Sequence, residues 1–151
     1  MKMKMKTIQT FNIPIVITEG ERKPKNFFLN LNNYNKWYFQ DKNKLKKKFK
    51  IQIIETVRQL KKVDKCYISY EIFYPTKREF DLDNVGSILS KFTHDVLTEV
   101  GVIKDDNYNI VECLTFKFGG VDKENPRAIV TIEGYKDKKG SKNGNTQGSC
   151  N

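Results

Sequence analysis

Residues 65–106 read KCYISYEIFYPTKREFDLDNVGSILSKFTHDVLTEVGVIKDD, and this stretch decides the fold. Apolar and polar side chains alternate over residues 65–74, which predicts a β-strand with one buried face, and Pro75 ends it. Over residues 83–100, apolar side chains recur at helical spacing. Gly101 follows, where helices commonly end in a left-handed residue. A half-buried strand leading into an amphipathic helix is therefore the centre of the predicted fold.

On the N-terminal side of this centre, the pattern predicts one strand and one helix. Residues 8–18 alternate like a strand, and Pro14 confines that strand to a sheet edge or a short length. Residues 19–42 show no periodicity and are expected to be irregular. Residues 43–62 carry a second apolar stripe at helical spacing.

On the C-terminal side, residues 109–118 and 127–135 are expected to form two strands of one hairpin. Together the elements predict an α/β (α+β) fold, with two main helices packed on a small mixed β-sheet. We expect a single domain over residues 7–135. A basic lead at residues 1–6 precedes it, and a disordered polar tail at residues 136–151 follows.

Charge is unevenly distributed along the 151 residues, whose formal net charge is +10. Residues 1–63 hold 16 Lys and Arg against 4 Asp and Glu, while residues 64–151 hold 12 against 14. A basic half can attract a polyanion by counterion release, although dense lysine can also serve only to solvate a surface. The three cysteines lack the paired spacing of a zinc site. No stretch approaches the roughly 20 apolar residues of a membrane span, so we expect no membrane partner and a cytoplasmic protein.

Basic side chains on two segments are candidates for contacts with DNA phosphates. One face of the helix expected at residues 43–62 is rich in lysine, and a polar segment before Asp81 adds two more cations. The candidates are Lys46, Lys47, Lys48, Lys77 and Arg78. Aromatic residues at 34–39 lie among these basic residues; they either stack on unpaired bases or close over the core.

Two acidic pairs carry the clearest chemical signal. Asp81 and Asp83 flank one residue before the predicted helix, and Asp105 and Asp106 follow it. The helix between the pairs spans about 25 Å, so they converge only if one pair lies within a strand or the chain doubles back. If they do converge, a hard dication such as Mg²⁺ relieves the repulsion between the carboxylates. Such a metal can polarise a phosphate and activate water for attack.

Simpler interpretations exist for each of these residues. One alternative is that Asp83 and Asn84 serve as a helix cap and have no further role. Likewise, residues 105–107 can be a turn with no further role. Lys91 can pair with Asp95 one helical turn later, or it can stabilise charge on a phosphate. His94, the single histidine, is expected on the surface.

The order of these residues resembles the RusA family of Holliday junction resolvases of bacteria and phages. The matching elements are Asp81-Leu82-Asp83-Asn84, then Lys91 and Asp95-Val96-Leu97, then Gly101-Val102-Ile103-Lys104-Asp105-Asp106. The Asn125-Pro126-Arg127 turn before the last strand is also similar. The resemblance covers about residues 66–135 and is loose in the N-terminal half.

This resemblance implies a homodimeric endonuclease that makes paired nicks in four-way DNA junctions, with Mg²⁺ as cofactor and Mn²⁺ as a substitute. It gives metal-binding catalytic roles to Asp81, Asp83 and Asp106, a supporting metal-binding role to Asp105, and the essential lysine role to Lys91. The chain departs from the family pattern in one place, because the stretch from Asn84 to Lys91 is about one helical turn longer.

Three alternative functions stay open on the sequence. The first is a metal-dependent nuclease with another target, such as branched or flap DNA. The second is a nucleic-acid-binding protein that has lost catalysis, against which the intact carboxylates argue. The third is a basic RNA-binding protein whose acidic turns are incidental.

Overall fold

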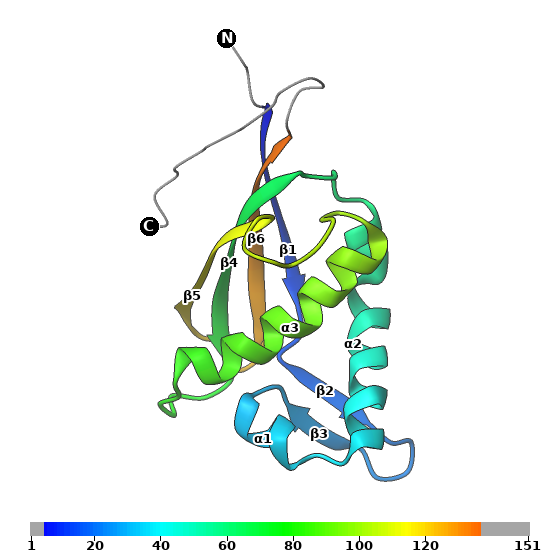
Figure 1. Ribbon diagram of the computed structural model, residues 1–151. Helices are drawn as coiled ribbons and strands as arrows, with labels where there is room; N and C mark the ends of the chain where they lie inside the picture. Colours follow the sequence, from blue (N-terminus) through cyan, green and yellow to red (C-terminus); the bar gives the residue numbers. More distant parts are fainter. Residues whose placement is uncertain (1–4, 137–151) are drawn as a thin grey trace.

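A mixed four-stranded sheet forms the centre of the computed structural model, which describes residues 5–136 (Figure 1). Its strands are β1 (Met5–Ile13), β4 (Lys65–Tyr74), β5 (Val111–Val121) and β6 (Arg127–Lys136). They lie in the order β1-β6-β4-β5. β4 runs parallel to β5 and antiparallel to β6, and β1 is antiparallel to β6.

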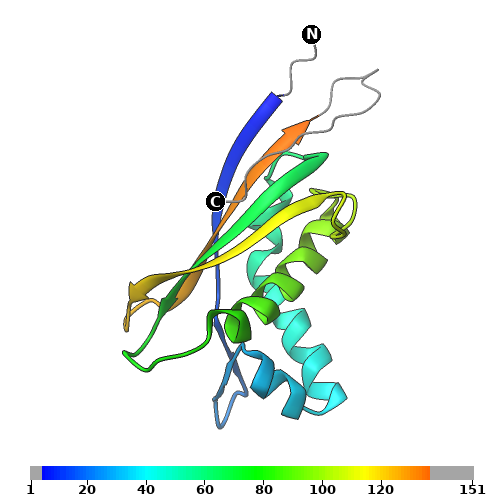
Figure 2. The same cartoon turned by 60° about the vertical axis from the view of Figure 1, so that its left-hand side comes forward.

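Two long helices, α2 (Phe39–Arg58) and α3 (Leu82–Val100), cover one face of this sheet (Figure 2). The predicted mixed α and β fold with two main helices on the sheet is therefore confirmed. No helix within residues 5–136 has the length and apolar character needed to cross a membrane.

The central strand β4 has the predicted alternation. Cys66, Ile68, Tyr70 and Ile72 are at most 1% exposed and face the helices, whereas the residues between them are partly exposed. β4 is hydrogen-bonded on both sides, to β6 and to β5. Apolar burial on one face and pairing along both edges explain why this strand has the clearest signal in the sequence.

The N-terminal segment differs from its prediction. The single strand expected at residues 8–18 is divided at Pro14 into β1, an edge strand of the main sheet, and β2 (Val16–Glu19). β2 pairs with β3 (Lys25–Phe28) in a separate two-stranded sheet. The division follows from the proline, which has no N–H to donate to a sheet.

The prediction of irregular structure at residues 19–42 is wrong, because this region contains β3 and the short helix α1 (Leu31–Lys36). Asn30 caps α1: its Oδ1 accepts a hydrogen bond of 2.8 Å from the Asn33 N–H. The second helix begins at Phe39, four residues before its predicted start, and ends at Arg58.

The predicted hairpin of the last two strands is also wrong. β5 and β6 follow each other in the chain but lie on opposite sides of β4. The reason is the crossover through α3, which returns the chain parallel to β4 and gives β5 one of its edges. β6 then occupies the other edge of β4.

The predicted helix at residues 83–100 is confirmed as α3, which begins one residue earlier, and the apolar stripe predicted for it is buried. Its predicted C-terminal residue is also confirmed, but the predictions for its N-cap and for His94 are wrong. Gly101 ends the helix with φ 91°, as predicted. The N-cap is Asp81, not Asp83 or Asn84, because α3 already begins at Leu82. His94 is 5% exposed, so its predicted surface position is wrong. It faces Tyr70 of β4, with ring centroids 6.0 Å apart, and burial lowers its pKa to about 4 although the Asp106 carboxylate acts in the other direction.

The predicted terminal segments fall mostly outside the described residues. Met5 and Lys6, placed in the basic lead, belong to β1, and Lys136, placed in the tail, ends β6. The remainder of both predictions lies outside residues 5–136.

Candidate functional site

The loop from β4 to α3 is held in place by an aromatic anchor. Phe80 stacks on Tyr74 at the end of β4, with ring centroids 4.3 Å apart. It also packs against Phe118 of β5 in a T-shaped arrangement, with ring centroids 6.0 Å apart. Because Phe80 precedes Asp81, this packing fixes where the first acidic pair leaves the sheet.

Asp81 and Asp83 sit at the start of α3 with free carboxylates. Asp81 occupies the N-cap, but its side chain makes no capping hydrogen bond. Asp83 lies in the first turn, and both residues are exposed. Within residues 5–136, neither carboxylate has an ion pair or hydrogen bond. Asn84 acts differently, since its Oδ1 accepts a 3.1 Å bond from the Asn32 N–H and ties α1 to α3.

A cavity of about 1210 Å³ opens beside Asp81. Its walls come from the end of β3, from α1 and its N-cap, from the loop after β4, from the first turn of α3 and from the ends of β4 and β5. The charged residues that line it are Lys36, Lys77, Arg78, Glu79 and Asp81. Aromatic side chains and the amides of α1 complete the wall: Phe28, Tyr74, Phe80, Phe118, Asn30, Asn32 and Asn33. Two of the predicted DNA contacts, Lys77 and Arg78, therefore share one cavity with a predicted metal ligand.

The second acidic pair lies beyond the other end of α3 in a tight turn. The Asp105 carboxylate accepts hydrogen bonds from the Asp106 N–H, at 2.8 Å, and from Asn107 Nδ2, at 2.9 Å. Asn107 in turn accepts a 3.0 Å bond from the Asn109 N–H. The turn interpretation thus holds for Asp105. Asp106 is exposed, and within residues 5–136 its carboxylate has no hydrogen bond or ion pair.

A single chain does not bring the two acidic pairs together. α3 has 19 residues, a length of about 28 Å. The Asp106 carboxylate lies near His94 and Asp95, since it raises the pKa of both groups, against burial at His94 and together with burial at Asp95. Within residues 5–136, no three His, Cys, Asp or Glu side chains gather closely enough to hold a metal ion.

Lys91 points toward α1. Its Nζ donates to the Tyr34 hydroxyl at 3.3 Å and lies 4.8 Å from the centre of the Tyr34 ring. The alternative Lys91–Asp95 ion pair is not among the ion pairs of residues 5–136. The catalytic role of Lys91 stays a prediction.

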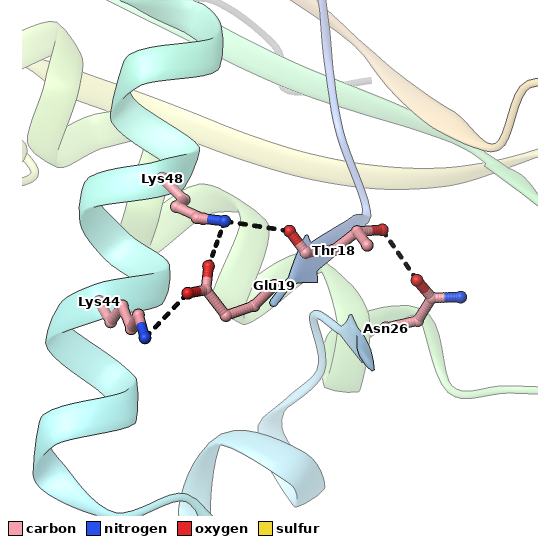
Figure 3. A network of polar contacts seen from close by, with 5 residues as sticks. All are labelled: Thr18, Glu19, Asn26, Lys44 and Lys48. Carbon is pink, nitrogen blue, oxygen red and sulfur yellow. Dashed lines mark hydrogen bonds and ion pairs between the residues drawn. The ribbon is translucent and has the colours of Figure 1, made fainter. Parts of the chain in front are cut away.

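The lysine-rich face of α2 is partly occupied by internal contacts. Glu19 of β2 pairs with Lys44 at 2.8 Å and also with Lys48, whose Nζ donates to the Thr18 carbonyl at 3.2 Å (Figure 3). These lysines lower the pKa of Glu19. Lys48, a predicted DNA contact, therefore fastens the β2–β3 hairpin to α2. Lys47 is exposed.

Sequence reasoning missed α1 as part of the site. The available signal was Asn30, a residue type that commonly caps helices. The aromatic residues at 34–39 were expected either to close over the core or to be available for stacking on bases, and the structure contains both kinds. Tyr34 and Trp37 pack against the core, while Tyr38 and Phe39 are 81% and 77% exposed.

The donor set at the start of α3 fits Mg²⁺. This ion takes hard oxygen ligands, often only one or two protein carboxylates, and completes its coordination with water and substrate phosphate. Asp81 and Asp83 offer two such exposed carboxylates, and Asp81 borders the cavity that Lys36, Lys77 and Arg78 also line. Comparisons with models of known protein families and with curated proteins gave no match for this chain.

Proposed function

We propose that the protein is a Mg²⁺-dependent endodeoxyribonuclease that resolves four-way DNA junctions by paired nicks, with Mn²⁺ as a substitute metal. In this proposal it acts as a homodimer in the cytoplasm of a bacterium or a phage-infected cell. The resemblance of residues 66–135 to the RusA family motif motivates the choice of substrate and of dimeric state.

The observation that carries the proposal concerns Asp81, an N-cap residue whose side chain makes no capping hydrogen bond and borders a cavity lined by Lys77 and Arg78. An Asp at an N-cap ordinarily accepts a backbone N–H and stabilises the protein by about 0.5–2 kcal/mol. The Asp81 side chain makes no such bond and instead borders the cavity lined by Lys77 and Arg78. A carboxylate that is free for a metal, next to cations that suit phosphates, is the combination that a phosphodiesterase requires.

The residues of the chain divide the work as follows. Asp81 and Asp83 hold the metal, which when bound supplies polarisation of the phosphodiester and a nucleophile at neutral pH. Lys77 and Arg78 bind the phosphates that flank the cut. Asp106 adds a further carboxylate, and Asp105 supports Asp106 through its turn.

A second subunit brings the separated acidic pairs together in this proposal. The length of α3 keeps Asp81 and Asp83 apart from Asp105 and Asp106 in one chain. In a two-fold dimer, each surface patch meets its partner in a symmetric arrangement, so one subunit's first pair can face the second pair of the other subunit. Such a dimer has two sites, one for each strand to be nicked.

A substrate panel tests the proposal. The protein is incubated with a labelled four-way junction, a flap, a linear duplex and RNA of matched length, in Mg²⁺ or in EDTA. We expect symmetric nicks in opposite strands of the junction, in Mg²⁺ only. Preferred cutting of the flap favours a nuclease of other branched DNA, and undiminished cutting in EDTA overturns the metal-dependent function.

A further inference from the structure

Three lysine side chains from two helices gather around one tyrosine of α1. The Nζ atoms of Lys42, Lys46 and Lys91 lie 4.6, 5.8 and 4.8 Å from the centre of the Tyr34 ring. Lys42 and Lys46 are one turn apart on α2, and Lys91 comes from α3. Because each ammonium group lies within 6 Å of the same ring centre, a distance below the Debye length of about 8 Å at physiological salt, the three groups repel one another.

Packing holds this arrangement in place. The Tyr34 ring meets Phe92 of α3 edge-on at 6.0 Å and Trp37 at 6.1 Å. The Asn32–Asn84 hydrogen bond fastens α1 to α3. Asn84 and Lys91 are seven residues apart, which places them on the same face of α3. Tyr34 is therefore a fixed platform toward which the lysines converge.

These lysines lack the carboxylate partners that other lysines of α2 have. Lys44 and Lys48 pair with Glu19, and Lys50 pairs with Glu99 at 2.6 Å. Within residues 5–136, no carboxylate forms an ion pair with Lys42, Lys46 or Lys91.

The surrounding groups indicate that positive charge dominates at Tyr34. Burial raises the pKa of the Tyr34 phenol, but Lys91 and Lys46 act against it and the net pKa is lowered. Asp95 is the nearby acid; burial raises its pKa, and Lys46 and Lys91 partly oppose that rise. An anion would relieve the repulsion among the lysines and could also accept a hydrogen bond from the Tyr34 hydroxyl.

We propose that Tyr34, Lys42, Lys46 and Lys91 form a binding site for one phosphate of a nucleic-acid backbone. The site is separate from the predicted metal ligands. The identity of the ligand rests on the proposed function, and the site deepens it by assigning a place to the substrate strand. Lys91 follows Asp83 by eight residues, about 12 Å along α3, so the bound phosphate lies a few nucleotides from the one that is cut.

Trp37 provides a local probe, because it is the only tryptophan of the chain and adjoins Tyr34. We would titrate the full-length protein with an eight-nucleotide oligothymidylate in EDTA and follow Trp37 emission. The wild type should give a saturable change. The triple variant Lys42→Gln/Lys46→Gln/Lys91→Gln should need at least about ten-fold more oligonucleotide. Lys62→Gln, which removes an exposed charge elsewhere, should match the wild type. Equal binding by the triple variant and the wild type overturns the site.

Two further arms identify the phosphate as the ligand. An oligothymidylate with uncharged methylphosphonate linkages should cause no change, and equal binding of it would assign the aromatic residues to base stacking instead. In a salt series, one shared phosphate predicts that the triple variant reduces the slope of log affinity against log salt by about 0.7, the value for one single-strand phosphate. A reduction three times as large indicates three independent contacts and contradicts a shared site.

Tyr34→Phe and Asp95→Asn serve as variants that keep the packing. Loss of the hydroxyl should weaken oligonucleotide binding. Loss of the Asp95 charge should strengthen it, because this negative charge repels the phosphate. If both variants bind the oligonucleotide like the wild type, the site is contradicted.

Failure of the site and failure of the proposed function are distinguishable. If the lysine-dependent Trp37 response occurs but no DNA is cut, the phosphate site stands and the nuclease proposal fails. If junctions are cut while the triple variant binds and cuts like the wild type, the nuclease stands and the site is wrong. For Lys91→Gln, the phosphate site predicts a higher KM with a largely retained kcat, whereas a catalytic lysine predicts a loss of kcat.

Discussion

The two ends of α3 carry the same residue type in opposite roles. At the start, Asp81 occupies an N-cap without capping, and its carboxylate is exposed beside a cavity. Beyond the end, the Asp105 carboxylate accepts two hydrogen bonds and holds a turn. Position in the sequence therefore does not decide what an aspartate does. The hydrogen bonds that it makes or forgoes are the better guide.

The difference also separates stability from activity. Asp81 forgoes a contribution that an N-cap side chain ordinarily makes, whereas Asp105 makes a comparable one. Variants at the start of α3 should therefore affect cleavage and spare the fold, whereas a variant at Asp105 should act mainly on the fold.

The largest expected effect is on cleavage by Asp81→Asn and Asp83→Asn. Each keeps the shape of the side chain and removes the charge that holds the metal, so the initial rate on a four-way junction in Mg²⁺ should fall on the order of 10²- to 10³-fold. Stability should change by less than about 0.5 kcal/mol, because both side chains are exposed. Glu55→Gln, an exposed carboxylate of α2, is the matched control. A fully active Asp83→Asn variant would remove this residue from the site.

The next effect compares the glycines near the two ends of α3. A Cβ at Gly86 would overlap the Phe116 ring of β5, while a Cβ at Gly101 meets open space but sits at a positive φ of 91°. Gly86→Ala should cost about 1–3 kcal/mol through overpacking, and Gly101→Ala about 1 kcal/mol through backbone strain. Urea denaturation measures both. Unchanged or higher stability of Gly86→Ala would mean that α3 can move away from β5 at no cost.

The third effect sharpens the contrast within the second acidic pair. Asp105→Ala removes two hydrogen bonds and should lower stability by about 1 kcal/mol. Asp106→Asn should leave stability nearly unchanged, because within residues 5–136 its carboxylate makes no hydrogen bond, and should reduce cleavage more than Asp105→Ala does. The same preparations serve for thermal melts and cleavage rates. The reverse ranking in cleavage would exchange the two roles.

The smallest expected effect is the change in the His94 pKa when Asp106 loses its charge. Burial holds its pKa at about 4, below the ordinary 6.5, and the Asp106 carboxylate raises it against that trend. The unfolded chain therefore binds a proton more readily, and stability should fall as pH drops from about 6.5 to 4. As the only histidine, His94 can be followed by NMR titration. Asp106→Asn should lower its pKa further and Asp83→Asn should not; equal shifts in both variants would show that Asp106 is not the nearer charge.

Much of the fold could be predicted from the sequence because β4 and α3 each have a strong period and bury one face. The short elements β2, β3 and α1 have 4, 4 and 6 residues, too few for a period to emerge. The prediction that β5 and β6 form a hairpin was wrong for another reason. Adjacent strands commonly form hairpins, but here the edges of β4 were better partners for both strands.

The candidate site was predictable in its residues and not in its geometry. The acidic pairs stand out in the sequence, and spacing already indicated that α3 separates them. Tyr34 could not be assigned, since its contact with Lys91 joins residues 57 positions apart. His94 was misplaced because α3 is buried by the sheet on one side and by α1 and α2 on others, so its buried surface is wider than one stripe.

Whether the two ends of α3 serve one metal site is tested most directly by mixing subunits. Asp83→Asn and Asp106→Asn proteins are unfolded and refolded together, then assayed on a labelled four-way junction in Mg²⁺. In a shared-site dimer, each mixed dimer has one site with both substitutions and one with neither. Random pairing should then restore nicking to about one quarter of the wild-type rate, in one strand per junction. If the mixture is no more active than either variant alone, the two acidic pairs do not combine across subunits, and the shared site is contradicted.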